Sequence, residues 1–362
     1  MNVVISKVTG SSDSKNAGAK APKDICMICE YEGWNSVQMI VPSSEQGKIV
    51  FSVKSIYSIF TQWESIKKGG AKIILYQHPM YWGSVGTAVV SKIIKKLKQE
   101  GIFTIVLIHD LEYLRCQNLL YQNTEYNHRV KESEISIMNV ATAVICHNDC
   151  MKESLIKQGI ESEKVIAMNI FDYLCNLKEE FPTRNTNDTD IAIAGNLNPK
   201  KCDYIYKLAS ENPNLKISLY GIGLDETLQT GNMRYRGSFS PEELPQKLDA
   251  KYGLVWDGPE ITTCCGPFGE YLKYNNPHKL SLFMAAGIPV ITWKEAAIAD
   301  FVKEQNVGIL VGSLCNLKNE LDKVTDEEYE IMKKNAEKIS LKVREGYYFK
   351  TALDKAVKLC IK

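Results

Sequence analysis

The sequence predicts an α/β protein with two separate domains, each built around a parallel β-sheet. Short apolar runs alternate with longer amphipathic stretches through most of the 362 residues. This spacing is typical of strand–helix–strand units, whose strands run parallel. The length also suits two domains of roughly 150 residues each. A polar stretch at residues 181–190 interrupts the alternation, and we interpret it as the linker between the domains.

Six strands are predicted in the first half of the chain. They are Val3–Val8, Val37–Val41, Lys72–Gln77, Phe103–His109, Ala143–His147 and Lys164–Met168. Amphipathic stretches between them, such as residues 50–68 and 85–100, predict helices that pack on the sheet. We therefore expect residues 1–180 to form the first domain.

The second half repeats the alternation after the linker. Its predicted strands are Ile191–Ala194, Lys216–Tyr220, Tyr252–Trp256, Ile288–Thr292 and Gly308–Val311. Residues 191–345 therefore form the predicted second domain. The tail from Asp326 to Lys362 has a helical pattern throughout, and we expect residues 346–362 to pack back on the first domain.

Composition excludes several classes of protein. A net charge of +1 gives no field that would attract nucleic acid. The sequence has no run of about 18 apolar residues that could span a membrane. Its first residues lack the pattern of a signal peptide, so we expect the eleven cysteines to be reduced thiols in the cytoplasm. Cys26-x-x-Cys29 has no second pair at zinc spacing, and no metal site is expected there.

Ligands of open parallel sheets bind beyond the carboxyl ends of the strands, so the loops that follow strands are the candidate sites. His109 and Asp110 follow a very apolar strand, and a carboxylate there can act as general base toward an acceptor hydroxyl. Asp110 could instead only cap the next segment. Residues 77–83 offer aromatic and polar groups that suit stacking on a sugar ring. The loop at residues 9–20 is small and polar, which suits contact with a sugar or phosphate or simply a surface loop, and it lacks the Gly-x-Gly-x-x-Gly of dinucleotide sites.

A loop and helix at residues 275–291 carry the strongest signal. Pro277 suits the first turn of a helix, and Asn275 or Asn276 can cap it. Lys279 then adds a positive charge at the positive end of the helix dipole, which makes sense if an anion binds there. The alternative is a surface lysine on a core helix. Gly287 ends the predicted helix.

Lys200 likewise places a positive charge at the start of a predicted helix, in a second loop. Gly195 permits close approach of the backbone, Pro199 marks a helix start, and Lys200 lies in its first turn. Two cations at helix starts favour an anion site for both. Phe239 could stack on a nucleobase or belong to the core.

Two further patterns are interpreted more plainly. Asp188-Thr189-Asp190 has the form that holds a divalent metal on a sugar diphosphate, but it precedes its strand, so we expect no metal. The basic stretch Lys92–Lys98 predicts the solvated face of a helix, with weak attraction to an anionic membrane surface as the alternative.

Several motifs together resemble one family. They are Gly195-Asn196, Lys200, Phe239–Leu244, Gly253–Trp256, Glu270-Tyr271, Lys279-Leu280 and Ala285–Ile291 in the second half, and Ile108-His109-Asp110 in the first. The chain resembles the bacterial glucosyltransferase 3-like family, which is often described together with β-1,6-galactofuranosyltransferases, among the GT-B glycosyltransferases. The resemblance implies two Rossmann-like domains with parallel sheets that face each other across a cleft.

The resemblance also implies a donor site for a UDP-sugar. Carried over by motif, it includes Asn16 in the first loop, Lys200, Phe239 and the helix start around Lys279. The full predicted donor site is Asn16, Gly195, Asn196, Lys200, Tyr220, Phe239, Pro277, His278, Lys279, Leu280, Ser281 and Leu282. Three positions depart from relatives: Lys200 where arginine is found, Phe239 where tyrosine is found, and Leu282 where many retaining enzymes have a glutamate that holds the ribose.

The resemblance implies transfer of a galactofuranosyl or glucosyl unit from a UDP-sugar to a glycan, glycoprotein or lipid-linked saccharide, in the biosynthesis of cell-surface polysaccharide or glycoprotein. We expect an inverting reaction without metal or other cofactor, with Asp110 as base. A nucleotide-sugar epimerase of the same shape and a non-catalytic nucleotide-sugar-binding subunit are the alternatives. A peripheral membrane contact at the inner face of the membrane and a homo-oligomer stay open.

Overall fold

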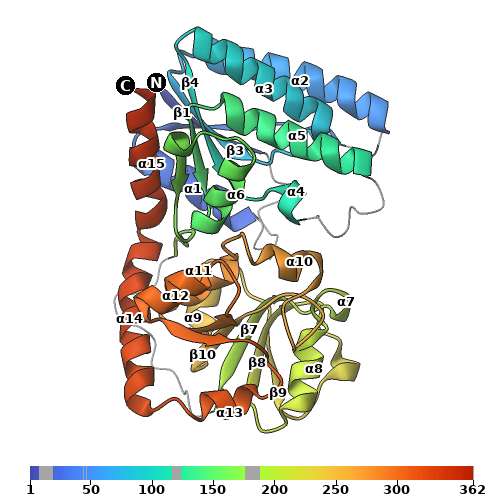
Figure 1. The fold of residues 1–362 in the computed structure, drawn as a ribbon, viewed down its shortest axis with the longest axis vertical. Coiled ribbons are helices and arrows are strands. Elements are labelled where there is room, and N and C mark those ends of the chain that lie inside the picture. The colour runs from blue at the N-terminus through green and yellow to red at the C-terminus, as the bar shows by residue number, and fades with distance from the viewer. Residues whose placement is uncertain (8–18, 44, 46, 116–123, 176–187, 362) are drawn as a thin grey trace. The chain divides into compact units, whose positions relative to one another are not determined.

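The computed structural model describes residues 1–7, 19–43, 45, 47–115, 124–175 and 188–361 (Figure 1). The contacts divide the chain into two units. Unit 1 comprises Met1–Ser12, Ala21–Met168 and Phe349–Lys362, and unit 2 comprises Asp13–Lys20 and Asn169–Tyr348. The chain thus enters unit 2 after the sixth strand, and its C-terminal residues count with unit 1.

Unit 1 contains a six-stranded parallel sheet in the order β2-β1-β3-β4-β5-β6. Its strands are β1 (Asn2–Lys7), β2 (Asn35–Met39), β3 (Ile73–His78), β4 (Phe103–Ile108), β5 (Ala143–Cys146) and β6 (Val165–Ala167). All six predicted strands are present, with ends displaced by up to two residues. The central strands are buried along nearly their whole length, as expected for a parallel sheet covered on both faces.

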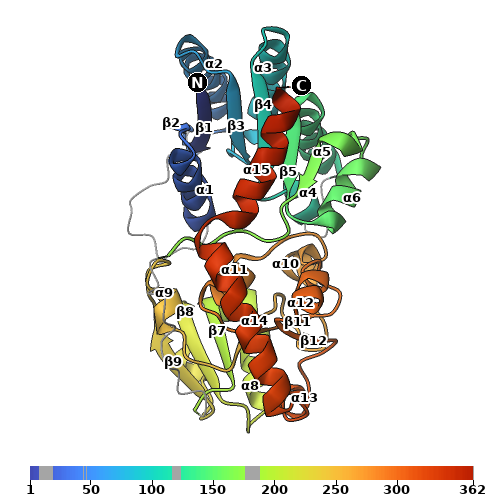
Figure 2. The same ribbon diagram turned by 90° about the vertical axis from the view of Figure 1, so that its left-hand side faces the viewer.

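Helices cover both faces of this sheet. They are α1 (Lys20–Tyr31), α2 (Lys48–Lys68), α3 (Gly83–Gln99), α4 (Glu112–Arg115), α5 (Thr124–Val140), α6 (Asp149–Lys157) and α15 (Tyr347–Cys360). Helices α2, α3 and α5 lie on one face, and α1 and α15 on the other (Figures 1 and 2). Val90, Ile94 and Leu97 recur at helical spacing in α3 and are buried.

Unit 2 contains a second parallel sheet of six strands, in the order β12-β11-β10-β7-β8-β9. Its strands are β7 (Ile191–Asn196), β8 (Ile217–Ile222), β9 (Met233–Gly237), β10 (Tyr252–Val255), β11 (Val290–Trp293) and β12 (Gly308–Val311). The sequence did not predict β9, because this edge strand alternates Arg234 and Arg236 with other residues and has no apolar run.

The helices of unit 2 are mostly short. They are α7 (Pro199–Cys202), α8 (Tyr204–Glu211), α9 (Leu244–Lys247), α10 (Gly266–Tyr271), α11 (His278–Ala285), α12 (Ala299–Gln305), α13 (Leu317–Leu321) and α14 (Asp326–Arg344). A capping box between Thr325 and Glu328 begins α14. The predicted continuous helical tail is wrong in one respect, since Gly346 adopts a φ of 77° and divides it into α14 and α15.

Strand order locates the candidate crevice of each unit. Counted from β7, the second sheet has the dinucleotide-fold order in which the direction of winding reverses between β7 and β10. In unit 1 the reversal falls between β1 and β3. Ligands of such sheets bind outside the carboxyl ends of these strand pairs, where neighbouring loops diverge.

Two glycines bring the loops after β7 and β8 together. Gly195 and Gly221 are paired across these strands, and an ideal Cβ built on Gly221 would lie 1.8 Å from the carbonyl oxygen of Gly195. Gly221 also has a φ of 147°. Only glycine fits this close approach, so the pair fixes the edge of the sheet from which the Gly195–Asn196 loop departs.

Helix α11 is held against the segment Phe171–Tyr173 of the same unit. The hydroxyl of Ser281 donates to the carbonyl of Phe171 at 2.7 Å, and the His278 ring stacks on Phe171 with centroids 5.2 Å apart. Burial, reinforced by the charge of Lys20, lowers the pKa of His278 to about 4. His278 is therefore neutral at physiological pH.

Gly221→Ala should lower the free energy of unfolding by about 3 kcal/mol or more, because the added methyl group meets backbone and the φ is strained. Urea unfolding of the purified protein measures this loss. Gly231→Ala is the matched control, since its Cβ meets nothing within 4 Å, and it should change stability by less than about 0.5 kcal/mol. Equal effects of the two variants would contradict the close approach.

Acid should destabilise unit 2 through His278. The unfolded chain takes up a proton near pH 6.5 and the folded chain only near pH 4, so this residue's contribution to stability is lost as pH falls through that window. Between pH 7 and pH 5 the loss is about 2 kcal/mol. Urea unfolding at both pH values should show a pH dependence smaller by this amount in His278→Gln. His128→Gln, at an exposed position, should keep the full dependence, and identical curves for wild type and His278→Gln would sink the assignment.

Candidate functional site

The start of α11 meets the carboxyl edge of the second sheet at its point of reversal. The ammonium of Lys279 donates to the carbonyl of Trp256 at 2.9 Å and to Oδ2 of Asp257 at 3.1 Å, both just beyond β10. Its Cε lies 4.0 Å from an ideal Cβ on Gly195, just inside the end of β7. Lys279 therefore joins the two loops between which a ligand of this fold is expected.

The environment of Lys279 keeps it charged. Burial acts to lower the pKa of its ammonium, but the carboxylate of Asp257, followed by Tyr204 and Cys202, outweighs burial and raises that pKa well above its ordinary value. The sequence left two alternatives for Lys279, a cation that awaits a bound anion and a surface lysine on a core helix. The structure matches neither fully, because the ammonium is ion-paired with Asp257 and only partly exposed. The Lys279 side chain is about one-fifth exposed.

Polar groups without protein partners gather at the start of α11. Pro277 occupies the N-cap position and helical residues begin at His278, so the prediction that Asn275 or Asn276 caps the helix is wrong. No side chain caps this end. Among the described residues, Oδ1 of Asn275 and both ring nitrogens of His278 are buried without a hydrogen-bond partner. Such groups are costly to bury unless a ligand or water satisfies them.

The loop after β7 is built by its own asparagines. Oδ1 of Asn196 accepts from the backbone N–H of Asn198 at 2.8 Å, and Asn198 caps α7 by accepting from the N–H of Lys200 at 2.9 Å. Asn196 thus shapes the turn with its carbonyl oxygen and keeps its amide N–H groups for other partners. Lys200 is exposed at the start of α7.

Tyr220 lies in β8, and Phe239 lies in the loop that follows β9. The Tyr220 ring is only 1% exposed, and its hydroxyl accepts from the N–H of Asp249 at 3.0 Å. It lies 6.5 Å from the partly exposed ring of Phe239, which also has the Lys247 ammonium 5.9 Å from its centroid. The structure thus places the Tyr220 side chain in the core as support for Phe239.

The remaining predicted residues of α11 point into the core. Leu280, Ser281 and Leu282 are 6% exposed or less, and Ser281 uses its hydroxyl on Phe171. What this helix can offer a ligand is therefore its first turn, from Pro277 to Lys279. Asn16 lies outside the described residues.

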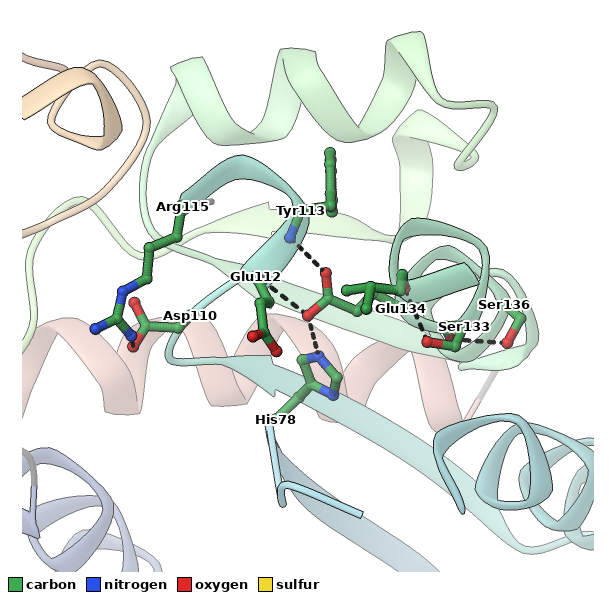
Figure 3. Close-up of polar contacts among 9 residues, drawn as sticks. His78, Asp110, Glu112, Tyr113, Arg115, Ser133, Glu134 and Ser136 are labelled. Atoms are coloured by element: carbon green, nitrogen blue, oxygen red, sulfur yellow. Dashed lines mark hydrogen bonds and ion pairs between the residues drawn. The ribbon is translucent and has the colours of Figure 1, made fainter. Parts of the chain in front are cut away.

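In unit 1, Asp110 lies beyond the carboxyl end of β4. Oδ2 of Asp110 accepts from the guanidinium of Arg115 at 3.2 Å, and both side chains are about one-third exposed. Figure 3 shows these two side chains directed toward each other. Asp110 therefore has the accessibility that a base requires, and Arg115 holds its orientation.

Glu134 is a buried carboxylate beside Asp110 that sequence reasoning missed. Its two oxygens accept from the backbone N–H groups of Glu112 and Tyr113 at 3.0 and 3.1 Å, and one lies 3.2 Å from Nε2 of His78 (Figure 3). Glu134 thus ties the end of β3 to the start of α4, the helix that follows Asp110. No sequence pattern indicated this role, because Glu134 lies in the middle of α5, far from the strand ends where candidate residues were sought.

Two further titratable side chains at this edge of the first sheet have raised pKa values. Burial, and then the charge of Glu134, raises the pKa of Glu112. Burial, and then the charge of Asp110, raises the pKa of Tyr81. Tyr81 follows β3, and its ring is 55% exposed. An exposed aromatic ring that senses the charge of a partly exposed carboxylate is an arrangement that suits a sugar.

Within the described part of the chain, no group of three or more His, Cys, Asp or Glu side chains is placed to hold a metal ion. Asp188 and Asp190 precede β7, and Oδ2 of Asp190 accepts from the N–H of Lys216 at 2.8 Å. Asp190 is therefore engaged with the backbone at the amino end of the sheet.

Comparison with known proteins finds one family across the chain. The model of the glucosyltransferase 3-like N-terminal domain matches residues 2–170, and that of the C-terminal domain matches residues 191–356. The β-1,6-galactofuranosyltransferase WbbI of Escherichia coli K12 is 31% identical over 351 residues, covering 95% of both chains. Glucosyltransferase 3 of Streptococcus gordonii is 26% identical, covering 99% of this chain and 98% of its own.

Solved structures share the fold at low identity. Sucrose-phosphate synthase from Thermosynechococcus elongatus covers the whole of both chains with a TM-score of 0.67 and 13% identity. Anabaena HepE, solved in complex with UDP, does so with a TM-score of 0.60 and 14% identity. The GT-B fold predicted from the sequence is thus confirmed, and with it the class of enzyme that the motifs indicated. The chain belongs to the glucosyltransferase 3-like family of glycosyltransferases.

Proposed function

We propose that this enzyme transfers a hexosyl unit from a UDP-sugar to a hydroxyl group of a glycan, glycoprotein or lipid-linked saccharide. The observation that carries the proposal is the start of α11, where Lys279 and buried polar groups without protein partners meet at the reversal point of a dinucleotide-type sheet. The complex of Anabaena HepE with UDP supports the same ligand here.

The diphosphate of the donor is proposed to bind at this helix start. The first-turn N–H groups and the helix dipole favour an anion, and the ammonium of Lys279 adds a full charge. Asp257 holds that ammonium in place, and exposed Lys200 supplies a second cation. Two lysines and helix-end donors can stabilise the leaving UDP without a metal ion, which is how we propose that it departs.

The acceptor is proposed to bind on unit 1. Asp110 would take the proton of the attacking hydroxyl, while Arg115 holds the carboxylate in its orientation. Tyr81 would stack on the acceptor sugar. One base and direct attack on the anomeric carbon give inversion of configuration at that carbon.

Galactofuranose and glucose are the proposed sugars, because the relatives are named for these two activities. Thermal stabilisation of the purified protein by a panel of UDP-sugars, followed by transfer assays with glycan acceptors, decides between them. Stabilisation by no UDP-sugar would overturn the proposed donor.

Replacing Lys279 should remove UDP binding. The double variant Lys279→Met with Asp257→Asn avoids leaving a buried carboxylate without its partner, and it should weaken UDP binding at least about tenfold. Titration calorimetry with UDP measures this. Lys334→Met, at an exposed position of α14, is the control that should retain binding, and Asp257→Asn alone should weaken binding less than the double variant because the ammonium is still present. Unchanged affinity in the double variant would show that the phosphates bind elsewhere.

Asp110→Asn should abolish transfer and spare the donor. We expect kcat to fall by a factor of about 10² to 10⁴, since a general base is lost, while UDP affinity stays within about twofold because a residue of unit 1 is changed. Initial rates with saturating UDP-sugar, together with calorimetry, separate the two effects. Asp354→Asn on α15 makes the same charge change at an exposed position and should be neutral. Full turnover of Asp110→Asn would exclude the base role.

A further inference from the structure

Helix α2 has two apolar faces. Ile59, Trp63 and Ile66 are 5% exposed or less and pack it on unit 1. A second set of large apolar side chains faces outward, with exposed fractions between 43% and 80%. It consists of Ile49, Val50, Val53, Tyr57 and Phe60, and we call it the α2 stripe.

The α2 stripe is a continuous surface. At 3.6 residues per turn its members fall within about 100° of the helix circumference. A surface helix normally turns one apolar stripe inward and polar groups outward. Contiguous apolar side chains on the outside mark a surface that another body covers.

Positive charge lies next to the α2 stripe, mainly beyond its C-terminal end. Helices α2 and α3 together carry eight lysines and one glutamate, in a chain whose net charge is only +1. Lys54 on α2 and Lys92, Lys95, Lys96 and Lys98 on α3 are exposed. The two helices lie side by side on the same face of the sheet (Figures 1 and 2). Their outward faces therefore form one surface, apolar along the first half of α2 and basic along the second half of α3.

We propose that this surface docks on a phospholipid bilayer rich in anionic headgroups. Apolar and aromatic side chains enter the boundary between headgroups and acyl chains, while lysines bind the anionic headgroups. A second copy of the chain fits less well, because it would cover the apolar side chains but would offer the lysines no anionic partner. The inference is independent of the donor, the acceptor and Asp110.

The contact lies on the membrane surface. None of the helices that the structure describes combines the length and the apolar character needed to cross a bilayer. Because the inner face of α2 stays packed on unit 1, the helix binds as part of the folded domain.

Sedimentation of the full chain with vesicles tests the proposal. Vesicles of phosphatidylcholine with about one-third phosphatidylglycerol should carry the protein down, and vesicles of phosphatidylcholine alone should carry roughly tenfold less. Raising salt from about 0.05 M to 0.5 M should release most of the bound protein, because the lysine–headgroup attraction is screened. Equal binding to both vesicles, or to neither, overturns the proposal.

Matched variants separate the two parts of the surface. Val53→Ser with Tyr57→Ser and Phe60→Ser should lower binding at least about tenfold, and so should Lys92→Gln with Lys95→Gln and Lys96→Gln. The controls carry the same changes at exposed positions elsewhere. They are Tyr31→Ser with Ile331→Ser and Leu341→Ser, and Lys334→Gln with Lys338→Gln and Lys355→Gln.

Circular dichroism and UDP-induced thermal stabilisation should be unchanged in all four variants. Binding equal to wild type in both surface variants overturns the proposal, as does equal loss in the controls. Light scattering that shows a dimer broken by the serine variant of the α2 stripe, with no vesicle binding by wild type, would identify a second copy as the occupant instead.

Discussion

The ion pair between Lys279 and Asp257 is the interaction on which the candidate donor site depends. It joins the first turn of α11 to the loop after β10, and Lys279 also reaches the end of β7. A partly buried pair of this kind adds little net stability, because desolvation offsets much of the attraction between the charges. Its value is positional: Asp257 fixes an ammonium beside helix-end N–H groups, so a diphosphate would meet a site that is already organised.

Unit 1 uses a buried carboxylate for a different purpose. Glu134 is satisfied by two backbone N–H groups and by His78, whereas Asp110 stays about one-third exposed. Burial separates the roles of the two acids. Glu134 uses its oxygens to hold the backbone of the loop, and Asp110 keeps enough exposure to reach a substrate. The membrane surface proposed for α2 and α3 belongs to this same unit, on one face of its sheet.

Local sequence predicted the fold well where patterns are local. Strand-like apolar runs placed eleven of the twelve strands found in the described residues, and the motifs around Gly195 and Lys279 indicated the family that the comparisons confirm. Prediction failed where tertiary context decides. Strand β9 alternates arginines at a sheet edge, Gly346 breaks a helix that its pattern would continue, and Pro277 takes the cap position expected for an asparagine.

By itself the sequence determined that there are two parallel α/β sheets and which loops follow their strands, because periodicity and turn residues act over a few positions. Only the tertiary structure decided what each site residue contacts. Lys279 finds Asp257 22 residues away, Glu134 meets His78 56 residues away, and Tyr220 turns into the core. These outcomes depend on strand order and packing, which bring distant segments together and leave no trace in local spacing.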